Sequence, residues 1–392
     1  MLKSSMKNPK VLWVNPSFLD YRIPLYKELN NLYDGNFYLV YSKQRIPQRC
    51  IDKIEKTLGD NAIGLPREKQ IKLGGRGDFA NTGVSVPFPR GLYKLIKSVN
   101  SDVIIAEGFF QFTPWALWYS FIRRKPLIIA YERTAHTERH CPWWRKAYRK
   151  LVNKFVSGYI VNGVLTKGYL ISQGVNPNKI FTGGMCADST QLALNSSTYG
   201  KKERENLKKK LCIGNSGLIY IFVGQLIERK GVNYLLEAWR EHSKRYPDDI
   251  MLIIGDGPLR EAYIEKYGTD RSVIFAGAID YSEIYKYYAI SDAFVMPTLE
   301  DNWSLVVPEA MACGLPVACS IYNGCYPELV QEGRNGTLFD PLKEDTILNS
   351  LSLFHDVDLQ SYGQESIKIE QEFSPKQTAL NVYKAVSETI DK

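Results

Sequence analysis

The stretch PTLEDNWSLVVPEAMACGLPV, residues Pro297–Val317, decides how the chain is interpreted. An apolar run that predicts a buried strand, Ala293–Pro297, leads into an acidic, polar loop that opens a helix. Asp301 and Glu309 stand eight positions apart, with the amides of Trp303–Leu305 between them. Amides at a helix start attract phosphate, and a carboxylate beyond them can accept two hydrogen bonds from a ribose diol. The pattern predicts a site for a sugar joined to a nucleotide by a diphosphate.

This segment resembles the acidic-x7-acidic motif of retaining GT-B glycosyltransferases of family 4, the glycosyl transferases group 1. Glu309–Val317 follow the family pattern closely, whereas Asp301–Ser304 replace its first four residues. The resemblance implies that Asp301 holds the donor sugar in a catalytic position and that the remaining motif positions bind the donor: Asn302, Trp303, Ser304, Leu305 and Glu309. The alternative is a helix start with ordinary capping acids. The strand–loop–helix context favours the functional interpretation.

Length and composition restrict the class of protein. With 392 residues, 44% of them hydrophobic, the chain can bury two cores, so two domains are expected. No apolar run approaches the ~20 residues of a membrane span, and the N-terminus lacks a secretory signal, which predicts a cytoplasmic protein. The seven cysteines are odd in number and form no C-x-x-C, and the four histidines are scattered. We therefore expect neither a disulfide framework nor a zinc site. The family resemblance implies that no metal or other cofactor is needed.

The hydrophobic pattern predicts an α/β protein with two Rossmann-like domains. The family resemblance implies that these domains face a central cleft, as in the GT-B fold. Short apolar runs alternate with helical patterns in both halves. The expected strands are Val11–Val14, Asn36–Tyr41, Asp102–Ala106, Leu127–Tyr131, Gly158–Asn162, Leu218–Val223, Met251–Ile254, Val273–Phe275, Ala293–Met296 and Pro316–Cys319. Gly59–Pro89 is expected to be a long loop with little regular structure.

The predicted domains are 1–190 on the acceptor side, 205–372 for the nucleotide sugar, and a C-terminal helix within 373–392. The polar segment Ser189–Glu205 marks the boundary between the first two. A Phe373–Ser374–Pro375 start signal predicts a helix over Pro375–Ile390. The resemblance implies that this helix packs back on the N-terminal domain.

A second motif, Gly224–Gly231, follows a predicted strand and resembles the family's Gly-Arg-Leu-x-x-x-Lys-Gly. In the family, the Arg and Lys neutralise the donor diphosphate. Lys230 matches and is assigned a catalytic role, whereas Gln225 replaces the Arg, which leaves Arg229 as the candidate for the missing cation. A buried diphosphate needs such charge-assisted partners. The alternative for Lys230 is a solvated turn lysine.

A third segment, Gly255–Asp256–Gly257, also follows a strand, and its glycines permit a tight turn and close approach of a ligand. The resemblance places this loop beside the nucleotide and Ile279 against the base. A plain turn between strand and helix would use the same residue types as Gly255, Asp256 and Gly257.

In the N-terminal half, Glu132 and His136 follow a predicted strand at its C-terminal end, where α/β sheets bind ligands. Either residue is a candidate for sugar binding or proton transfer, and the sequence does not distinguish between them. Tyr21 and Arg22 lie in a segment that resembles the Tyr-Arg-x-Pro-Leu start of some family members. That resemblance implies a position on the acceptor side.

A basic region lies between Arg139 and Ala187, with eight cations and no acid, a charge of +8 that equals the formal net charge of the chain. Such a region favours a polyanionic partner. A helix near Trp143–Phe155 combines Trp with cations, which predicts contact with an anionic membrane surface through Arg145, Lys146, Arg149 and Lys150. The aromatic stretch Trp115–Lys125 is expected to belong to the core.

Together with the family resemblance, these features predict a metal-free, retaining glycosyltransferase that moves a hexose-type sugar from a UDP- or GDP-sugar. The expected acceptor is a saccharide or a polyprenyl-linked saccharide in the synthesis of a cell-surface polysaccharide or glycolipid, reached from the inner face of the cytoplasmic membrane. One alternative is a nucleotide-sugar epimerase or phosphorylase on the same scaffold. Another is a nucleic-acid-binding protein, which the sequence disfavours because no nucleic-acid motif is present.

Overall fold

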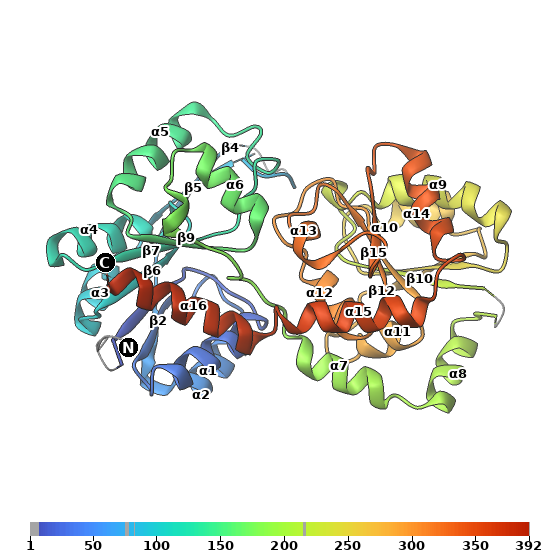
Figure 1. The fold of residues 1–392 in the computed structure, drawn as a ribbon, viewed down its shortest axis with the longest axis horizontal. Helices are drawn as coiled ribbons and strands as arrows, with labels where there is room; N and C mark the ends of the chain where they lie inside the picture. The colour runs from blue at the N-terminus through green and yellow to red at the C-terminus, as the bar shows by residue number, and fades with distance from the viewer. Residues whose placement is uncertain (1–7, 75–77, 82, 215–216, 392) are drawn as a thin grey trace. The chain divides into compact units, whose positions relative to one another are not determined.

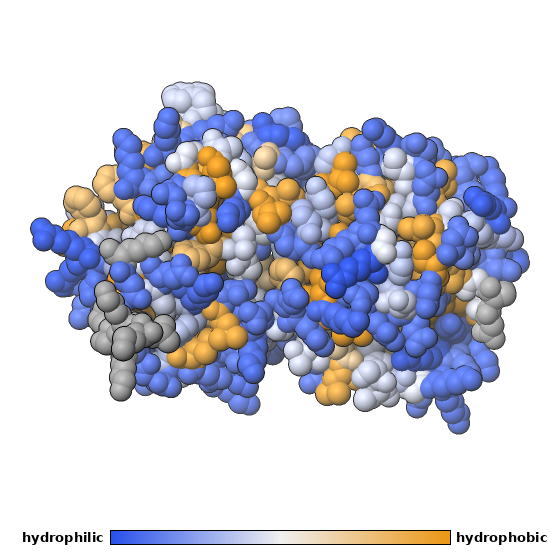
Figure 2. Space-filling view, viewed as in Figure 1, coloured by the Kyte–Doolittle hydropathy of each residue, from blue (hydrophilic) through white to orange (hydrophobic). Residues whose placement is uncertain are grey.

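The computed structural model describes residues 8–74, 78–81, 83–214 and 217–391. The chain divides into two compact units (Figure 1). The first contains the residues up to Asp188 together with those from Pro375 onward, and the second is Ser189–Ser374. The face drawn in Figure 2 is mainly hydrophilic, with scattered apolar groups.

The first unit is built on a parallel sheet, which within the described residues has seven strands in the order β3-β2-β1-β6-β7-β8-β9. The inner strands are rich in Val and Ile and almost wholly buried, as expected when helices cover both faces of a sheet. The strands are β1 (Val11–Val14), β2 (Phe37–Ser42), β3 (Ala62–Leu65), β6 (Val103–Glu107), β7 (Leu127–Tyr131), β8 (Gly158–Val161) and β9 (Ile180–Phe181).

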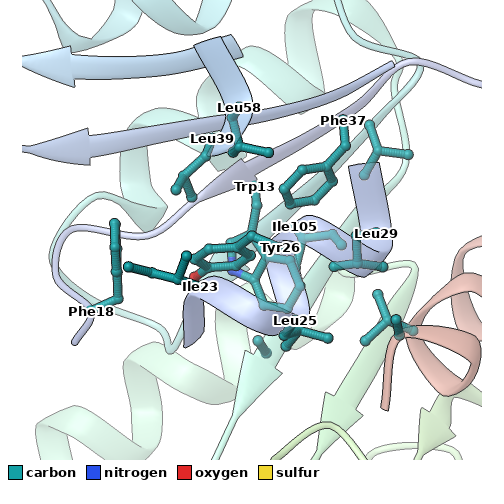
Figure 3. Packing of buried hydrophobic residues seen from close by; sticks show 14 of the residues in the cluster. Trp13, Phe18, Ile23, Leu25, Tyr26, Leu29, Phe37, Leu39, Leu58 and Ile105 are labelled. Atoms are coloured by element: carbon teal, nitrogen blue, oxygen red, sulfur yellow. The ribbon is translucent and has the colours of Figure 1, made fainter. Parts of the chain in front are cut away.

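Helices connect these strands. They are α1 (Arg22–Leu32), α2 (Gln48–Leu58), α3 (Leu92–Val99), α4 (Thr113–Arg123), α5 (Trp143–Val152) and α6 (Val164–Ser172), with short 3-10 turns η1 (Gly59–Asn61), η2 (Asn153–Phe155) and η3 (Pro177–Lys179). The core beside β1 is aromatic: the ring centroids of Trp13 and Tyr26 lie 5.6 Å apart, and those of Tyr26 and Phe37 lie 5.8 Å apart (Figure 3). Such ring pairs stabilise the packing of α1 on the sheet beyond the contribution of the buried apolar area alone.

The second unit is built on another parallel sheet, with the order β12-β11-β10-β13-β14-β15 across its described strands. The strands are β10 (Ile219–Val223), β11 (Ile250–Ile254), β12 (Val273–Gly277), β13 (Ala293–Met296), β14 (Val317–Ser320) and β15 (Gly336–Phe339). The helices are α7 (Ser189–Thr198), α8 (Lys201–Lys210), η4 (Glu228–Lys230), α9 (Val232–Arg245), α10 (Arg260–Tyr267), α11 (Tyr285–Ala289), α12 (Val306–Ala312), α13 (Tyr326–Leu329), α14 (Glu344–Leu353) and α15 (Leu359–Gln371).

The C-terminal helix α16 spans Pro375–Ile390, as predicted, and packs against α1 in the first unit. Its buried side chains Val382, Ala385 and Val386 join the same core as Trp13. The expectation that this helix returns to the N-terminal domain is therefore confirmed. In the described part of the chain, no helix is both long and apolar enough to span a membrane.

One expectation about a connecting segment is wrong. Within Gly59–Pro89, the strands β4 (Lys69–Gly74) and β5 (Gly83–Phe88) pair as an antiparallel hairpin, and β3 joins the main sheet. Charge and glycine obscured the strand pattern there. The predicted boundary segment Ser189–Glu205 contains α7 and the start of α8, both of which belong to the second unit.

Candidate functional site

In the second unit, the loops that follow β10 and β13 meet at Gly231. This glycine has a φ of +68°, and a Cβ placed on it would lie 2.1 Å from the carbonyl oxygen of Pro297. Only glycine permits that approach without a shift of backbone. The amide of Leu299 also donates to the carbonyl oxygen of Arg229 at 2.8 Å. The close packing brings the basic end of η4 beside the acidic motif.

A charged cluster forms where these loops meet. Lys230 Nζ lies 2.6 Å from Asp301 Oδ2, and Arg229 Nη1 lies 3.5 Å from the same oxygen. Burial raises the pKa of Asp301, but the charge and hydrogen bond of Lys230, followed by Arg229, outweigh it and hold the pKa below its ordinary value. Two cations thus share one carboxylate, which leaves the cluster with one positive charge in excess. Such an excess suits an anionic ligand.

The loop Asn302–Leu305 differs from its prediction in one respect. The amide of Trp303 donates to Asp301 Oδ1 at 3.2 Å, and that of Ser304 donates to Asn323 Oδ1 at 3.3 Å. These two amides are therefore not available to bind phosphate, because they already donate hydrogen bonds to side chains of the same unit. In the described structure, Asn302 Oδ1 and Trp303 Nε1 are buried without a hydrogen-bond partner. Buried polar atoms of that kind call for a ligand or water.

Glu309 lies on the buried helix α12, which has seven residues and begins at Val306. The hydroxyl of Tyr288 donates to Glu309 Oε2 at 3.4 Å, and burial, followed by the charge of Glu309, raises the pKa of that phenol. The helix is too short for its dipole to carry the argument for phosphate binding. Glu309 thus stays a predicted donor-binding residue on the strength of its motif.

The remaining predicted donor residues lie on loops of the same unit. Gly255 and Gly257 have φ values of +140° and +158°, and a Cβ on Gly255 would lie 1.8 Å from the carbonyl oxygen of Gly224. The glycines are therefore needed for packing of the loops after β10 and β11. The carboxylate of Asp256 accepts from the amide of Gly257 at 2.7 Å. Gln225 is exposed, and Ile279 lines a surface pocket with residues of α8 and α11.

In the first unit, the structure joins two predicted residues to a third that the sequence did not reveal. Arg22 is buried, and its Nη2 lies 3.1 Å from Glu132 Oε1 and 3.6 Å from Glu107 Oε1. Glu107 also accepts from Trp13 Nε1 at 3.1 Å and from Asn15 Nδ2 at 3.2 Å. Burial, opposed by Arg22 and reinforced by Glu132, raises the pKa of Glu107 to about 7. A carboxyl group in this state can exchange a proton near neutral pH.

Glu107 is the last residue of β6, a strand that the sequence predicted. Its position directly after an apolar run was the one feature by which the sequence could have marked it as a site residue. Tyr21 flanks the cluster: the Arg22 guanidinium lies 5.8 Å from its ring centroid, and burial raises the pKa of its hydroxyl. His136 is half-buried in the turn after Glu132, and the Arg139 side chain donates to its carbonyl oxygen at 2.7 Å. The structure thus joins Glu132, but not His136, to Arg22 by an ion pair.

The predicted membrane contact is wrong for two of its four cations. Arg145 and Arg149 are buried, whereas Lys146 and Lys150 are exposed. Arg149 Nη1 lies 2.6 Å from Glu138 Oε2, an acid just outside the basic region, which holds this arginine inside the unit. The helical spacing located the apolar residues correctly but could not show that two guanidinium groups point inward.

The expectation for Trp115–Lys125 is also wrong in part. Trp118, Phe121 and Ile122 on α4 are exposed, with 58%, 62% and 48% of their surface accessible. Phe121 contacts Phe155, itself 47% exposed, with ring centroids 6.0 Å apart. These side chains and Leu151 form an exposed surface, here called the α4–α5 apolar surface: Trp118, Phe121, Ile122, Leu151 and Phe155.

Two histidines expected to be scattered meet at one carboxylate in the second unit. Nε2 of His242 and Nε2 of His355 lie 2.8 and 2.7 Å from Asp249 Oδ2. Among the described residues, these three could hold a metal ion by ligand type. However, His242 Nδ1 is buried without a hydrogen-bond partner among the residues that the structure describes, whereas a metal-bound histidine normally donates that hydrogen. The group fits a hydrogen-bonded link between α9, β11 and α14 better than a metal centre.

Two parallel α/β units, one with a cationic cluster at its loop ends, define the GT-B class of fold. Comparison with solved structures agrees. Anabaena Alr3699/HepE in complex with UDP matches 97% of this chain and 100% of its own, with a TM-score of 0.73 and 17% identity. Sucrose-phosphate synthase from Thermosynechococcus elongatus matches with a TM-score of 0.65 and 16% identity, over 96% of this chain and 98% of its own. The predicted GT-B fold is confirmed.

Sequence comparison adds a family match. Residues 203–359, which lie in the second unit, match the family described as glycosyl transferases group 1. The chain is 28% identical to the alpha-monoglucosyldiacylglycerol synthase of Acholeplasma laidlawii over 183 residues, 43% of this chain and 46% of the relative. It is 37% identical to the sulfoquinovosyl transferase SQD2 of Arabidopsis thaliana over 134 residues, 33% of this chain and 26% of the relative. The matched part thus spans less than half of either relative.

Proposed function

We propose that the chain is a retaining glycosyltransferase that moves a hexose-type sugar from a UDP- or GDP-sugar to a lipid-linked saccharide or glycolipid. The observation that carries the proposal is the cluster of Lys230, Arg229 and Asp301 in the region that matches the group 1 family. Its excess positive charge matches a diphosphate, and its carboxylate matches sugar hydroxyls. The buried Asn302 Oδ1 and Trp303 Nε1, which have no partner in the described structure, add two polar atoms for the same ligand.

In this proposal, the protein positions the reactants and supplies charge rather than a nucleophile. The acceptor hydroxyl attacks the anomeric carbon on the face that the diphosphate leaves, and a donor phosphate oxygen takes its proton. Lys230 and Arg229 neutralise the departing diphosphate, so a metal ion is not required. Asp301 holds the sugar, and Glu309 accepts hydrogen bonds from the ribose.

The acceptor proposal rests on the α4–α5 apolar surface. Large apolar side chains grouped on a surface mark an interaction site. Exposed cations adjoin this surface in sequence: Arg123, Arg124, Lys146, Lys150 and Lys154. Aromatic and cationic groups together favour an anionic bilayer. The matched relative from Acholeplasma laidlawii, which is named for a monoglucosyldiacylglycerol, supports a lipid acceptor. We place the enzyme at the inner face of the cytoplasmic membrane.

The proposed reaction is tested by incubating the protein with radiolabelled UDP- and GDP-hexoses and a membrane lipid extract. Label should move into the lipid fraction, with release of the nucleoside diphosphate and retention of anomeric configuration by NMR. Isomerised sugar without transfer would support an epimerase, and inversion would exclude the retaining mechanism. If neither nucleotide sugar is consumed, the proposed function fails.

The membrane proposal has its own test. The double variant Trp118→Ser/Phe121→Ser should sediment with anionic vesicles at least about tenfold less than the unaltered protein, because burial of each ring contributes ~1.5–3 kcal/mol. Leu380→Ser, an exposed apolar position on α16, is the matched control. Equal sedimentation of the double variant would remove this surface from the proposal.

A further inference from the structure

A cavity of about 540 Å³ lies within the first unit, separate from the donor cluster. It opens beside the C-terminal ends of β6 and β7, where Glu107 and Tyr131 line it. Aromatic rings form much of its wall: Phe109, Phe110, Trp115 and Trp144. A cavity at the carboxyl ends of parallel strands, with apolar walls, is the usual place for a small ligand in an α/β unit.

Three arginines also line this cavity: Arg133, Arg145 and Arg149. Two of them share one acid, because Arg149 Nη1 lies 2.6 Å from one oxygen of Glu138 and Arg133 Nη1 lies 3.0 Å from the other. Among the residues that line the cavity, the acid is Glu107, which belongs to the Arg22 cluster. The cavity wall therefore has more guanidinium groups than local carboxylates can balance.

Arg145 is the guanidinium left without an acid. It is buried, and in the described part of the chain it donates only to neutral oxygens, the side chain of Asn81 and the carbonyl of Gly83. It also lies 5.3 Å from the ring centroid of Trp144 and 5.7 Å from that of Phe110. Burial, followed by the charge of Arg133, lowers its pKa. A buried cation with neutral partners has an unmet demand for an anion.

The aromatic wall continues out of the cavity along both helices. On α4, Trp115 lines the cavity and Trp118, three residues further on the same face, belongs to the α4–α5 apolar surface. On α5, Tyr148 stacks on Phe110 with ring centroids 5.1 Å apart. Trp118 then stacks on Phe121 at 6.5 Å. Aromatic side chains of α4 and α5 therefore lie both at the cavity and on the surface proposed to lie on the bilayer.

We propose that this cavity binds the phosphate-bearing head of an anionic lipid, with Arg145 and Arg133 on the phosphate and the lipid chain along α4 and α5. The inference deepens the proposed function, on which it rests for the identification of this lipid as the acceptor. A guanidinium fork suits phosphate oxygens, and aromatic rings suit the adjoining chain.

The test uses full-length protein and isothermal titration with three probes below their aggregation limits: farnesyl phosphate, farnesol and inorganic phosphate. Farnesyl phosphate should bind at least about tenfold more tightly than either of the others. It alone carries both a phosphate for the arginines and an apolar chain for the aromatic wall. Equal affinity for farnesol would show an apolar cavity only. Equal affinity for inorganic phosphate would show a free-anion site. Either result overturns the proposal.

Arg145→Gln should weaken farnesyl phosphate at least about tenfold and leave farnesol unchanged, while Arg145→Lys should retain part of the affinity. Lys97→Gln, which removes an exposed cation on α3, is the matched control and should bind as the unaltered protein does. If Arg145→Gln fails to fold by circular dichroism, Arg133→Gln tests the same charge from a side chain that is 35% exposed. Unchanged affinity in the folded variants would contradict the assignment.

UDP and GDP are titrated into the same samples. A failure of the lipid-site proposal can then be distinguished from a failure of the transferase proposal. Nucleotide binding without binding of farnesyl phosphate would remove the lipid site and leave the transferase proposal intact. Binding of farnesyl phosphate without either nucleotide would leave the anionic-lipid site and remove its interpretation as an acceptor site.

Discussion

The two units each contain a buried ionic cluster, and the clusters have opposite charge balance. In the first unit, one cation, Arg22, faces two carboxylates, Glu107 and Glu132. In the second, two cations, Lys230 and Arg229, face one carboxylate, Asp301. Burial, opposed by Arg22 and reinforced by Glu132, raises the pKa of Glu107 to about 7, whereas Lys230 and Arg229 outweigh burial and hold the pKa of Asp301 below its ordinary value.

This difference indicates what each cluster can accept. An excess carboxylate in a buried site can take up a proton, and an excess cation can take up an anion. Only the second cluster is therefore suited to a diphosphate, which agrees with its position in the region that matches the group 1 family. The imbalance, rather than the presence of charged residues, distinguishes the two sites.

The largest effect is expected from Arg22→Met, which leaves Glu107 and Glu132 together without a counter-charge. Loss of one partner from a buried ionic group costs ~3–5 kcal/mol of unfolding free energy. Urea unfolding at about pH 8 measures it, since both carboxylates are then ionised in the unfolded chain. Lys27→Met, an exposed position on the same helix, is the control. A loss below about 1 kcal/mol in Arg22→Met would mean that the cluster is not a stabilising unit.

The next effect is expected from Lys230→Ala, which removes the closer cation from the second cluster. Loss of a charge-assisted contact to the departing diphosphate costs ~2–4 kcal/mol of activation free energy, so turnover should fall at least about 30-fold. Lys244→Ala, an exposed lysine on α9, is the control. Near-normal turnover by a folded Lys230→Ala protein would remove this residue from the site.

A smaller effect concerns the pH dependence of stability, measured by urea unfolding of the unaltered protein and of Glu107→Gln. The pKa of Glu107 in the folded chain, about 7, lies above its unfolded value of about 4.3. The stability linked to its protonated form is fully present below about pH 4.3 and is lost as pH rises through about 7. Glu107→Gln cannot ionise, so its stability relative to the unaltered protein should rise over this interval by ~2–3 kcal/mol. If the difference in unfolding free energy between the two proteins did not change over this pH interval, Glu107 would be ionised throughout it, and its pKa would not be raised in the folded chain.

The smallest change in nucleotide affinity is expected from Asp301→Ala. Asp301 is proposed to hold the sugar, and its removal leaves both cations for the diphosphate. UDP or GDP affinity should therefore change less than about threefold, while transfer should fall at least about tenfold. A collapse of nucleotide affinity would show that Asp301 instead orients Lys230 or Arg229 for the nucleotide.

The sequence predicted the regular parts of the fold because they depend on local patterns. Buried strands such as β1 and β7 are apolar runs between polar turns, and α16 begins at a Pro. The β4–β5 hairpin was missed because cross-strand pairing, not its local composition, makes it a strand pair.

The candidate sites depend on contacts between distant segments, which limits prediction from one sequence. The motif made Lys230 and Asp301 candidates, but not their 2.6 Å contact across 71 positions. Glu107 was missed since only the fold places it beside Arg22, 85 positions earlier in the chain. Helical spacing on α5 likewise could not show that Arg145 and Arg149 point inward, because that depends on Asn81 and Glu138.

The central claim is that the cationic cluster of the second unit binds a nucleoside diphosphate. Isothermal titration of UDP and GDP into the unaltered protein and into Lys230→Gln tests it most directly. We predict that one of the two nucleotides binds the unaltered protein and binds Lys230→Gln at least about tenfold more weakly, since one charge-assisted contact is lost. Absence of binding for both nucleotides, or equal affinity in the folded variant, would contradict the account.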